Sequence, residues 1–532
     1  MRTLLATAAT IVLAGCGATA AYGAEAVPPR GKPGYPTIAW DKCGDAGLQS
    51  RMAECGYLTV PMDYADPAGR TIKLAVSRIK HSVPADKYQG VMLINPGGPG
   101  ASGVNLSALG ENVPKGAGAA YDWIGFDPRG VGASQPKLSC DSKYQGYNRP
   151  AYVPSTPELE QTWLKRARDY AAACARRGGE LLDHLRTADT VRDMESLRAA
   201  LGAEQINFYG YSYGTYIGQV YATRYPERVR RMVLDGVVNP DRIWYDSNLD
   251  QDVAFDRNIK IYFKWLAEHD AAYHLGKTGA KVEKLFYAEQ ARLAKKPAGG
   301  FIGPDELTDV FLQAGYYVFG WDSVGSAFSS WVNRKDPAPL RALFDATNPQ
   351  AEGSDNGYAI YLGVQCTDKQ WPRSWDKWRT DNWRVHKAAP FETWGNAWYN
   401  APCLTWAGKA GKPVRVDGRK VPPILLVSET LDAATPFSGS LEVRKRFPRA
   451  ALIEGVGGTT HAGSLFGNAC IDNSVADYLA TGELPRRVKA NRADKRCAAM
   501  RPAEPAATQP ERAAADATLS RRMELQRQIG AH

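Results

Sequence analysis

The segment Gln205-Ile-Asn-Phe-Tyr-Gly-Tyr-Ser-Tyr-Gly214 joins a short apolar run to a Gly-x-Ser-x-Gly sequence centred on Ser212. This pattern places a serine on a sharp, strained turn between a strand and a helix. A Cβ atom at Gly210 or Gly214 would collide with the adjoining strand or helix, because such a turn is very tight. After the turn, residues 215–224 have helical apolar spacing and stop at Tyr225-Pro226. The segment therefore predicts Ser212 as a catalytic nucleophile.

A hydrolase that uses this turn needs a carboxylate and then a histidine later in the chain, each on a loop after a strand. Of the seven histidines, His532 is the last residue of a polar tail, and five others precede the first plausible acid-bearing strand: His81, His184, His269, His274 and His386. His461 remains. It lies in the loop 457–463, directly after the apolar run 450–456, which reads as the last strand of the sheet.

The acid is expected after the apolar run 423–428, which is typical of a buried parallel strand. Glu429 and Asp432 are the candidates there. Asp432 is preferred, because Glu429 continues the strand, whereas the loop needs a few residues to carry a carboxylate round to the imidazole. The predicted triad is therefore Ser212, Asp432 and His461.

Acyl transfer also needs N–H donors for the developing oxyanion. The amide of Tyr213, directly after the nucleophile, would supply one. The apolar run 91–95 leads into the glycine-rich segment 96–103, where Gly98 or Gly97 would supply the second. A phosphate-binding loop is the competing interpretation, but the segment lacks both the Lys-Ser/Thr ending and the dinucleotide spacing.

Taken together, these motifs resemble the secreted bacterial tripeptidyl aminopeptidases and their prolyl-aminopeptidase-like relatives among the α/β-hydrolases. The resemblance spans about residues 40 to 500 and includes the segments Asn95–Gly103, Asp127–Ser134, Gly210–Gly214, Leu431–Pro436 and the histidine loop. It implies a serine exopeptidase that acts on peptide substrates, a helical cap and no cofactor. Two departures, Ala433-Ala434 in the acid loop and Thr459-Thr460 before the histidine, leave the triad intact and bear on substrate preference.

The chain alternates strand-like and helical stretches, which favours a mostly parallel sheet covered on both faces, with the first strands antiparallel. The expected fold is an α/β-hydrolase fold with an inserted helical cap domain and an eight-stranded sheet, its candidate strands being 57–60, 72–76, 91–95, 123–126, 206–209, 232–234, 424–427 and 452–453. The expected divisions are an export signal (1–26), the core (40–238 and 401–500), the cap (239–400) and a mobile basic tail (501–532).

The amino terminus carries Arg2, an apolar run over residues 4–14 and small residues afterwards, which is typical of an export signal. Within it, Leu13-Ala-Gly-Cys16 resembles a bacterial lipobox, in which the cysteine becomes lipidated; cleavage after Ala24 or Ala26 is the alternative. The protein is therefore expected outside the cell or at its surface, and membrane attachment through a lipid on Cys16 is preferred to cleavage after Ala24 or Ala26.

Without Cys16, eight of the nine cysteines remain, an even number suited to an oxidising compartment. Pairing neighbours in the chain closes short loops and predicts four disulfides: Cys43–Cys55, Cys140–Cys174, Cys366–Cys403 and Cys470–Cys497. A metal site is the rival interpretation, but no Cys-x-x-Cys or His-Glu-x-x-His spacing supports it, so no metal is expected.

The formal net charge of +10 does not indicate a nucleic-acid partner. From Arg486 onward there are 11 basic and 5 acidic residues, so 11 − 5 = 6 units of the excess lie in the final 47 positions. The catalytic body is nearly neutral. The tail is rich in Ala, Pro and Arg, and a solvated charge run is the favoured interpretation.

An aminopeptidase must bind a free α-ammonium group, which calls for a carboxylate in the cleft. Asp368 is the first sequence candidate and Glu429 the second; a surface acid beside a disulfide is the alternative interpretation of Asp368. A carboxylesterase or lipase with the same triad is the alternative function. The sequence does not define the number of residues removed per cut, the side-chain preference or the oligomeric state.

Overall fold

The computed structural model describes residues 37–502 and 504–505. Its centre is one sheet with the strand order β1-β2-β3-β5-β4-β6-β7-β8-β9-β10. The strands are β1 (Asp41–Lys42), β2 (Glu54–Pro61), β3 (Thr71–Ile79), β4 (Val91–Asn95), β5 (Asp122–Phe126), β6 (Ile206–Tyr211), β7 (Val229–Asp235), β8 (Leu425–Glu429), β9 (Ala451–Val456) and β10 (Lys495–Ala498). The pairings from β1 to β5 along this order are antiparallel, and those from β5 to β10 are parallel.

The sheet therefore has ten strands in the described residues, whereas the sequence predicts eight. All eight predicted strands are present, and the antiparallel start is confirmed. The two that the sequence analysis misses, β1 and β10, are short and mostly polar, and each lies at an edge of the sheet. An edge strand buries little apolar surface, so its sequence carries no alternating pattern.

Alternate residues of the strands enter two separate hydrophobic clusters, one on each face of the sheet. In β4, Leu93 packs into one cluster, and Met92 and Ile94 pack into the other. The first face is covered by α3 (Thr187–Ala200), α4 (Tyr213–Arg224) and α14 (Ser438–Arg446). The second is covered by α15 (Ala469–Thr481) and the 3-10 segments η2 (Val104–Asn112) and η3 (Pro114–Ala120).

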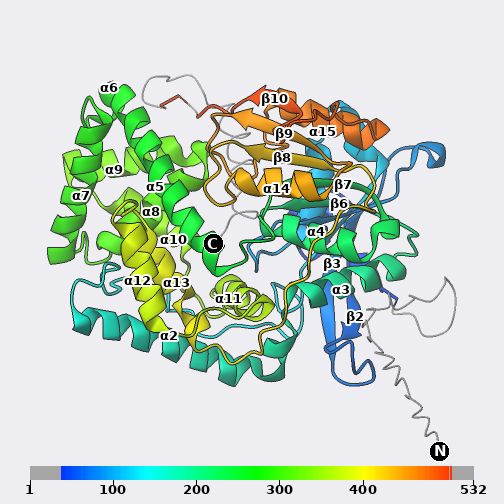
Figure 1. Cartoon of the computed structure of the whole chain (residues 1–532), viewed down its shortest axis with the longest axis horizontal. Helices are drawn as coiled ribbons and strands as arrows, with labels where there is room; N and C mark the ends of the chain where they lie inside the picture. Colours follow the sequence, from blue (N-terminus) through cyan, green and yellow to red (C-terminus); the bar gives the residue numbers. More distant parts are fainter. Residues whose placement is uncertain (1–36, 503, 506–532) are drawn as a thin grey trace, which may run out of the picture.

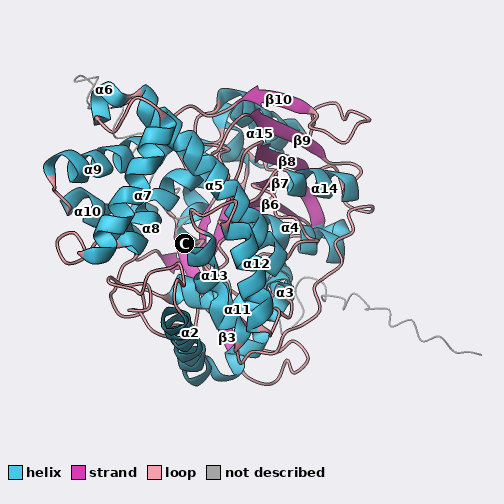
Figure 2. Cartoon of the chain, turned by 60° about the vertical axis from the view of Figure 1, so that its left-hand side comes forward, coloured by secondary structure: helices cyan, strands magenta, loops and turns pink. Residues whose placement is uncertain are grey.

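A long helical insertion separates β7 from β8 (Figure 1). Its helices are α5 (Tyr245–Glu268), α6 (Asp270–Tyr273), α7 (Gly279–Lys295), α8 (Pro304–Tyr316), α9 (Trp321–Arg334), α10 (Ala338–Thr347), α11 (Asn356–Asp368), α12 (Trp375–His386) and α13 (Thr393–Asn400), with η6 (Val318–Gly320) and η7 (Ala401–Leu404). Figure 2 shows α5, α12 and α13 packed together in front of the strands. The remaining elements are α1 (Ala46–Gln49), α2 (Pro157–Gly178), η1 (Ala85–Lys87), η4 (Gly179–His184) and η5 (Pro226–Arg228).

Four disulfides join the same pairs that the sequence analysis expects: Cys43–Cys55, Cys140–Cys174, Cys366–Cys403 and Cys470–Cys497. Disulfides of this number are typical of proteins exported from the cytoplasm. The export segment, Cys16 included, lies outside the described residues, as does most of the basic tail.

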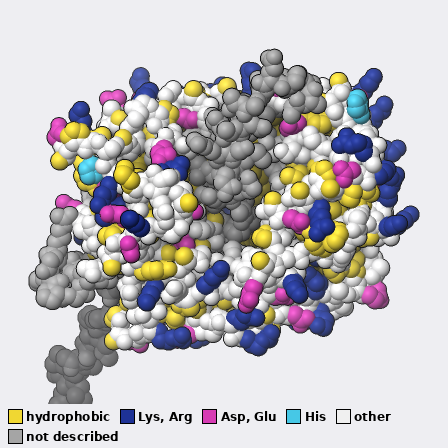
Figure 3. All heavy atoms as spheres, turned by 180° about the vertical axis from the view of Figure 1, so that it is seen from behind, with side chains coloured by type: hydrophobic (Ala, Val, Ile, Leu, Met, Phe, Trp, Pro, Cys, Tyr) yellow, Lys and Arg dark blue, Asp and Glu magenta, His cyan; other side chains and the backbone are white. Residues whose placement is uncertain are grey.

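The described part of the chain contains no helix with the length and apolarity needed to cross a lipid bilayer. Within the same residues, no three His, Cys, Asp or Glu side chains are grouped in a way that could hold a metal ion. On the face shown in Figure 3, Lys and Arg side chains are interspersed with Asp and Glu and do not form one continuous basic patch.

Candidate active site

Ser212 follows β6 and precedes α4 with φ 53° and ψ −124°, a backbone conformation that is rare for any residue except glycine. Its neighbours explain why glycine is required on both sides. A Cβ at Gly210 would lie 2.6 Å from the carbonyl oxygen of Gly214, and one at Gly214 would lie 2.6 Å from that of Asn95. The turn is therefore as tight as the Gly-x-Ser-x-Gly pattern predicts.

His461 and Asp432 form a buried pair on the loops after β9 and β8. His461 Nδ1 lies 2.8 Å from Asp432 Oδ2, and the two residues are 2% and 1% exposed. Thr435 holds the carboxylate from the other side, since its backbone N–H donates to Oδ1 at 3.0 Å and its hydroxyl donates to Oδ2 at 2.7 Å. A carboxylate fixed in this way can hold the imidazole with Nδ1 protonated and Nε2 free to accept a proton.

Replacing Thr435 with valine should lower kcat/KM about 10- to 100-fold, because the hydroxyl is a charge-assisted donor to Asp432. Valine keeps the shape of the side chain and the backbone hydrogen bond. Steady-state kinetics of T435V on a peptide arylamide measures the effect, with Thr162→Val on the exposed face of α2 as the matched control. Wild-type kinetics for T435V would show that the backbone donor alone positions Asp432.

The histidine loop is anchored to β7 through Asp235. The backbone N–H and the hydroxyl of Ser464 both donate to Asp235 Oδ2, at 2.7 and 2.5 Å. Burial raises the pKa of Asp235 to about 6, although these donors oppose the rise. At the same strand end, the N–H of Ser212 donates to the carbonyl oxygen of Asp235 at 2.9 Å. One residue therefore fixes the backbone of the serine turn and the loop that carries His461.

Ser212 and His461 line the same cavity. Among the described residues, no hydrogen bond joins the serine hydroxyl to the imidazole. Catalytic hydrogen bonds are often long or poorly aligned before substrate binds. The arrangement of Ser212 and His461 is therefore compatible with proton transfer between them in the substrate complex.

The glycine-rich loop after β4 lies against the serine turn. A Cβ at Gly97 would be 2.6 Å from the carbonyl oxygen of Tyr211 and 3.0 Å from the amide nitrogen of Tyr213. The N–H of Gly97 already donates to Asn95 Oδ1 at 3.0 Å. Within the described residues, the N–H groups of Gly98 and Tyr213 have no hydrogen-bond acceptor, and both residues line the cavity. Gly98 is thus better suited than Gly97 to act as the second oxyanion donor.

The helical insertion also supports the catalytic loops. The N–H of His461 donates to the carbonyl oxygen of Tyr316, at the end of α8, at 2.9 Å. From α5, Arg257 and Asn258 donate to the carbonyl oxygen of Leu431 at 2.6 and 2.9 Å. The side chain of Gln251 donates to the carbonyl oxygen of Ala434 at 2.7 Å. The backbone around both Asp432 and His461 is therefore held by the insertion.

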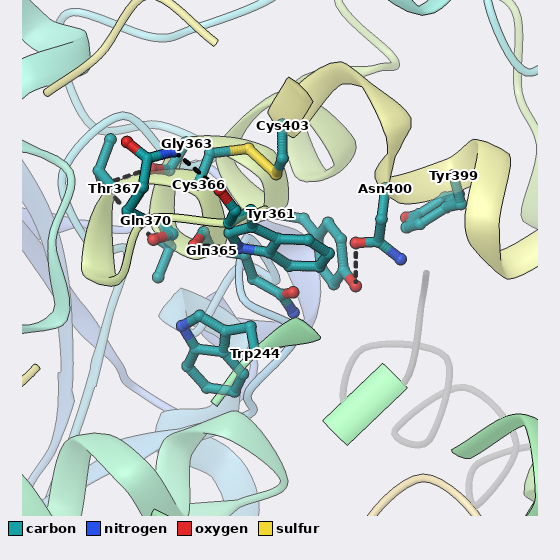
Figure 4. Close-up of a disulfide and its surroundings, with 12 residues drawn as sticks. Trp244, Tyr361, Gly363, Gln365, Cys366, Thr367, Gln370, Tyr399, Asn400 and Cys403 are labelled. Carbon is teal, nitrogen blue, oxygen red and sulfur yellow. Dashed lines mark hydrogen bonds between the residues drawn. A yellow bond between two sulfur atoms is a disulfide. The ribbon is translucent and has the colours of Figure 1, made fainter. Parts of the chain in front are cut away.

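The cavity has a volume of about 480 Å³, which is typical of a site for a small ligand. Its floor is the catalytic edge of the sheet, and its walls come from α5, α8, α10, α11 and the segment around α13. Figure 4 shows the disulfide Cys366–Cys403, which joins α11 to η7, together with the cavity-lining residues Tyr361 and Gln365. The hydroxyl of Tyr361 donates to Asn400 Oδ1 at 3.0 Å.

Neither sequence candidate for binding the substrate amine lines this cavity. Asp368 is 5% exposed, and its carboxylate accepts hydrogen bonds from Thr187, through both the N–H and the hydroxyl, and from the indole of Trp244. These bonds turn it into the core behind Trp244, so the expectation for Asp368 is corrected. Burial raises its pKa to about 6.

Glu429 points away from the cavity, toward the histidine loop, so the expectation for this residue is corrected as well. It is 3% exposed, and its carboxylate packs so tightly on Gly455 and Gly458 that a Cβ at either glycine would collide with it. Neither oxygen has a hydrogen-bond partner of good geometry among the described residues. Burial raises the pKa of Glu429 to about 8; the charges of Asp235 and Asp432 add to the rise, and the backbone of Met500 opposes it.

Replacing Glu429 with glutamine should therefore stabilise the protein in alkaline solution. The raised pKa means that the stabilising contribution of this carboxyl is full below about pH 4.5 and is lost as the pH rises through about 8. E429Q removes this loss, worth roughly 2–4 kcal/mol above pH 8. The Tm of E429Q should exceed that of the wild type at high pH and approach it near pH 5, and the exposed control Glu483→Gln should show neither effect. If the Tm values of the wild type and E429Q changed in parallel with pH, Glu429 would not have the raised pKa on which this prediction depends.

The arrangement after the parallel strands defines the class of protein. A serine on a strained turn after β6, an acid after β8 and a histidine after β9 follow the chain order of a serine hydrolase of the α/β-hydrolase fold. The family model described as "alpha/beta hydrolase fold" matches residues 90–462, which include all these positions.

Curated relatives identify the group more closely. The chain is 43% identical to the tripeptidyl aminopeptidase of Streptomyces lividans over 468 residues, which cover 85% of this chain and 86% of that protein. It is 30% identical to the serine protease Hip1 of Mycobacterium tuberculosis, covering 90% of this chain and 95% of that protein. Carboxylesterase B of Mycobacterium tuberculosis is 31% identical, with coverage of 87% and 92%. The chain belongs to the tripeptidyl aminopeptidase family of α/β-hydrolases, and it is more distant from the carboxylesterase than from the Streptomyces enzyme.

Three residues that the structure places at the site were not among the sequence candidates. The sequence could have indicated Thr435, because a threonine three positions after an aspartate often donates a hydrogen bond to the aspartate carboxylate in a turn. Asp235 directly follows the predicted strand 232–234, a position at which active-site residues are common in parallel sheets. The third, Glu392, lies in the insertion between α12 and α13 and lines the cavity. No local pattern distinguishes it from an ordinary surface acid.

Proposed function

We propose that the protein is an exported serine exopeptidase that removes short peptides, most simply tripeptides, from the free N terminus of peptide substrates through an acyl-enzyme. One observation carries the proposal: Ser212, His461, Tyr213 and Gly98 line a single cavity whose walls are the helices of the insertion. Such an enclosed site suits a chain end better than the middle of a long polypeptide. The two Streptomyces relatives are named tripeptidyl aminopeptidases, which supports the same reaction.

In the proposed reaction, the hydroxyl oxygen of Ser212 attacks the scissile carbonyl carbon, and His461 Nε2 takes the hydroxyl proton. The N–H groups of Tyr213 and Gly98 bind the oxyanion, and Asp432 stabilises the imidazolium. His461 then protonates the leaving amine as the C–N bond breaks. Water, deprotonated by His461, attacks the ester, and the peptide leaves with a new carboxyl group while the proton returns to Ser212.

Arylamides of one to four residues, with the N terminus free or acetylated, test the proposal. The expected result is fastest release of the arylamine from a free tripeptidyl substrate and little release from its acetylated form. Faster cleavage of acetylated than of free substrates would indicate an endopeptidase. Turnover of simple esters without turnover of any arylamide would favour the carboxylesterase alternative.

The proposed chain division follows the sequence expectation, with the core formed by 40–238 and 401–500 and the cap by 239–400. Its support is the position of the insertion between Asp235, where β7 ends, and Leu425, where β8 begins. Export through residues 1–26 is supported by the four disulfides.

Attachment through a lipid on Cys16 is the finer proposal, and it rests on the lipobox-like sequence alone. Metabolic labelling with a radioactive fatty acid in a bacterial host should mark the wild-type protein and not Cys16→Ser. Release of unlabelled wild-type protein into the medium would favour cleavage after Ala24 or Ala26 instead.

A further inference from the structure

We propose that the carboxylate of Glu392 binds the α-ammonium group of the substrate and so sets the number of residues between the free N terminus and the scissile bond. This inference rests on the proposed function and adds a binding residue to it.

The first observation is that Glu392 is a buried acid without a partner. It lines the cavity and is 7% exposed. It stands at the N-cap position of α13, yet its side chain does not cap the helix. In the described part of the chain, its carboxylate forms no hydrogen bond and no ion pair. Buried carboxylates are normally paired, because an unpaired charge is costly to bury.

The second observation is the sign of the surrounding charges. The cavity wall contains two acids, Glu392 and Asp309, and no Lys or Arg among the described residues. Asp309 is already neutralised, since Arg149 and the hydroxyl of Tyr152 contact its carboxylate at 2.5 and 2.9 Å. Glu392 is therefore the lining carboxylate that is left for a positively charged ligand.

Other acids around Glu392 strengthen this preference. Burial raises the pKa of Glu392 well above its ordinary value, and the charges of Asp252, Asp309 and Asp256 raise it further. Asp252, on α5, is 1% exposed, and its one hydrogen bond comes from Asn396, which also lines the cavity. Asp309 and Asp256 are paired with Arg149 and Lys260, so Glu392 and Asp252 are the two acids of this group without a cationic partner in the described residues. A cation bound here would favour their ionised forms.

The third observation places this carboxylate near the reaction centre. The ring of Tyr316 lies 5.9 Å from the ring of His461, between centroids, and the charge of Glu392 raises the pKa of the same tyrosine. His461, Tyr316 and Glu392 also line the same cavity, so the acid and the imidazole face one shared space. Ser212 and Glu392 line one cavity of about 480 Å³, and an extended peptide covers about 3.3–3.6 Å per residue, so the cavity has room for a short peptide only. Tyr316, Tyr361 and Tyr399 also line the cavity, and the faces of aromatic rings attract ammonium groups.

The test compares wild type with Glu392→Gln on three substrates: a free tripeptidyl p-nitroanilide, its N-acetylated form and p-nitrophenyl acetate. For E392Q we expect kcat/KM on the free substrate to fall about 10- to 150-fold, as for loss of a hydrogen bond between charged groups. Hydrolysis of p-nitrophenyl acetate should change less than about twofold, because this ester has no ammonium group. The preference for tripeptidyl over dipeptidyl and tetrapeptidyl substrates should also become weaker. Glu352→Gln, an exposed acid of the insertion, is the matched control.

The outcomes separate the two proposals. If the wild type hydrolyses the ester and no arylamide of any length, the proposed function fails and the inference fails with it. If the wild type cleaves free arylamides and E392Q does so equally well, the function stands and the role of Glu392 is wrong. If E392Q does not fold, a crystal structure of Ser212→Ala with uncleaved tripeptidyl arylamide decides. It should place the ammonium nitrogen within hydrogen-bond distance of Glu392, and a position elsewhere would overturn the inference.

Discussion

Replacing Ser212 with alanine is expected to lower kcat on a tripeptidyl arylamide by roughly 10⁵- to 10⁶-fold, as removal of the nucleophile does in other serine hydrolases. Without the hydroxyl there is no acyl-enzyme, and only oxyanion binding and substrate positioning remain. The fold should be unaffected, because the side chain of Ser212 makes no hydrogen bond among the described residues and alanine suits the turn as well as serine does.

The measurement for S212A combines kinetics with labelling by a fluorophosphonate, which the wild type should accept and the variant should not. Circular dichroism and Tm should match those of the wild type. Ser326→Ala, at an exposed position of α9, is the matched control and should retain full labelling and turnover. Labelled S212A with substantial turnover would mean that another residue is the nucleophile.

Asp432→Asn is expected to lower kcat by about 10⁴-fold, the second largest effect. The imidazole Nδ1 lies 2.8 Å from Asp432 Oδ2, and an amide at this position can donate to Nδ1. His461 would then carry its proton on Nε2 and could not accept the proton of Ser212. The amide would also leave the hydroxyl of Thr435 without its charged acceptor.

Steady-state kinetics of D432N between about pH 6 and pH 9 measures this effect, and fluorophosphonate labelling should be slowed in parallel. Asp376→Asn, an exposed acid at the start of α12, controls for loss of one negative charge. A loss of less than tenfold in D432N would mean that the imidazole is oriented by other contacts, such as its backbone bond to Tyr316.

The elements that sequence could predict are those whose requirements are local. A Cβ at Gly210 would meet Phe208 and Gly214, both within a few residues of Ser212, so this requirement is visible in the sequence itself. Gly214 is needed because it packs against Asn95 at the end of β4, and only the Gly-x-Ser-x-Gly pattern indicates that contact. Chain order and strand ends restricted the sequence candidates to Asp432 and His461, and the structure brings these two side chains together. The disulfide pairs were accessible for a similar reason, since each closes a short loop.

The substrate-binding acid could not be found in this way. Glu392 reaches the cavity because α5, α8 and α13 come together from distant segments, and nothing near residue 392 records that packing. Asp368 was a reasonable sequence candidate beside Cys366, but the sequence does not show which side of α11 faces the cavity. In the structure that side chain turns to Thr187 and Trp244 instead.

The hydrogen bonds from α5 and α8 to Leu431, Ala434 and His461 limit how this enzyme can be re-engineered or diversified. A truncated variant that keeps only the strands and their flanking helices would lose these hydrogen bonds. The loops that carry Asp432 and His461 would then be less well positioned, even if the variant folded. Chimaeras that exchange the helical insertion between relatives should be active only when the new insertion forms equivalent hydrogen bonds to the catalytic loops. Substrate preference is therefore easier to change by substituting cavity-lining side chains of the insertion than by replacing the whole insertion.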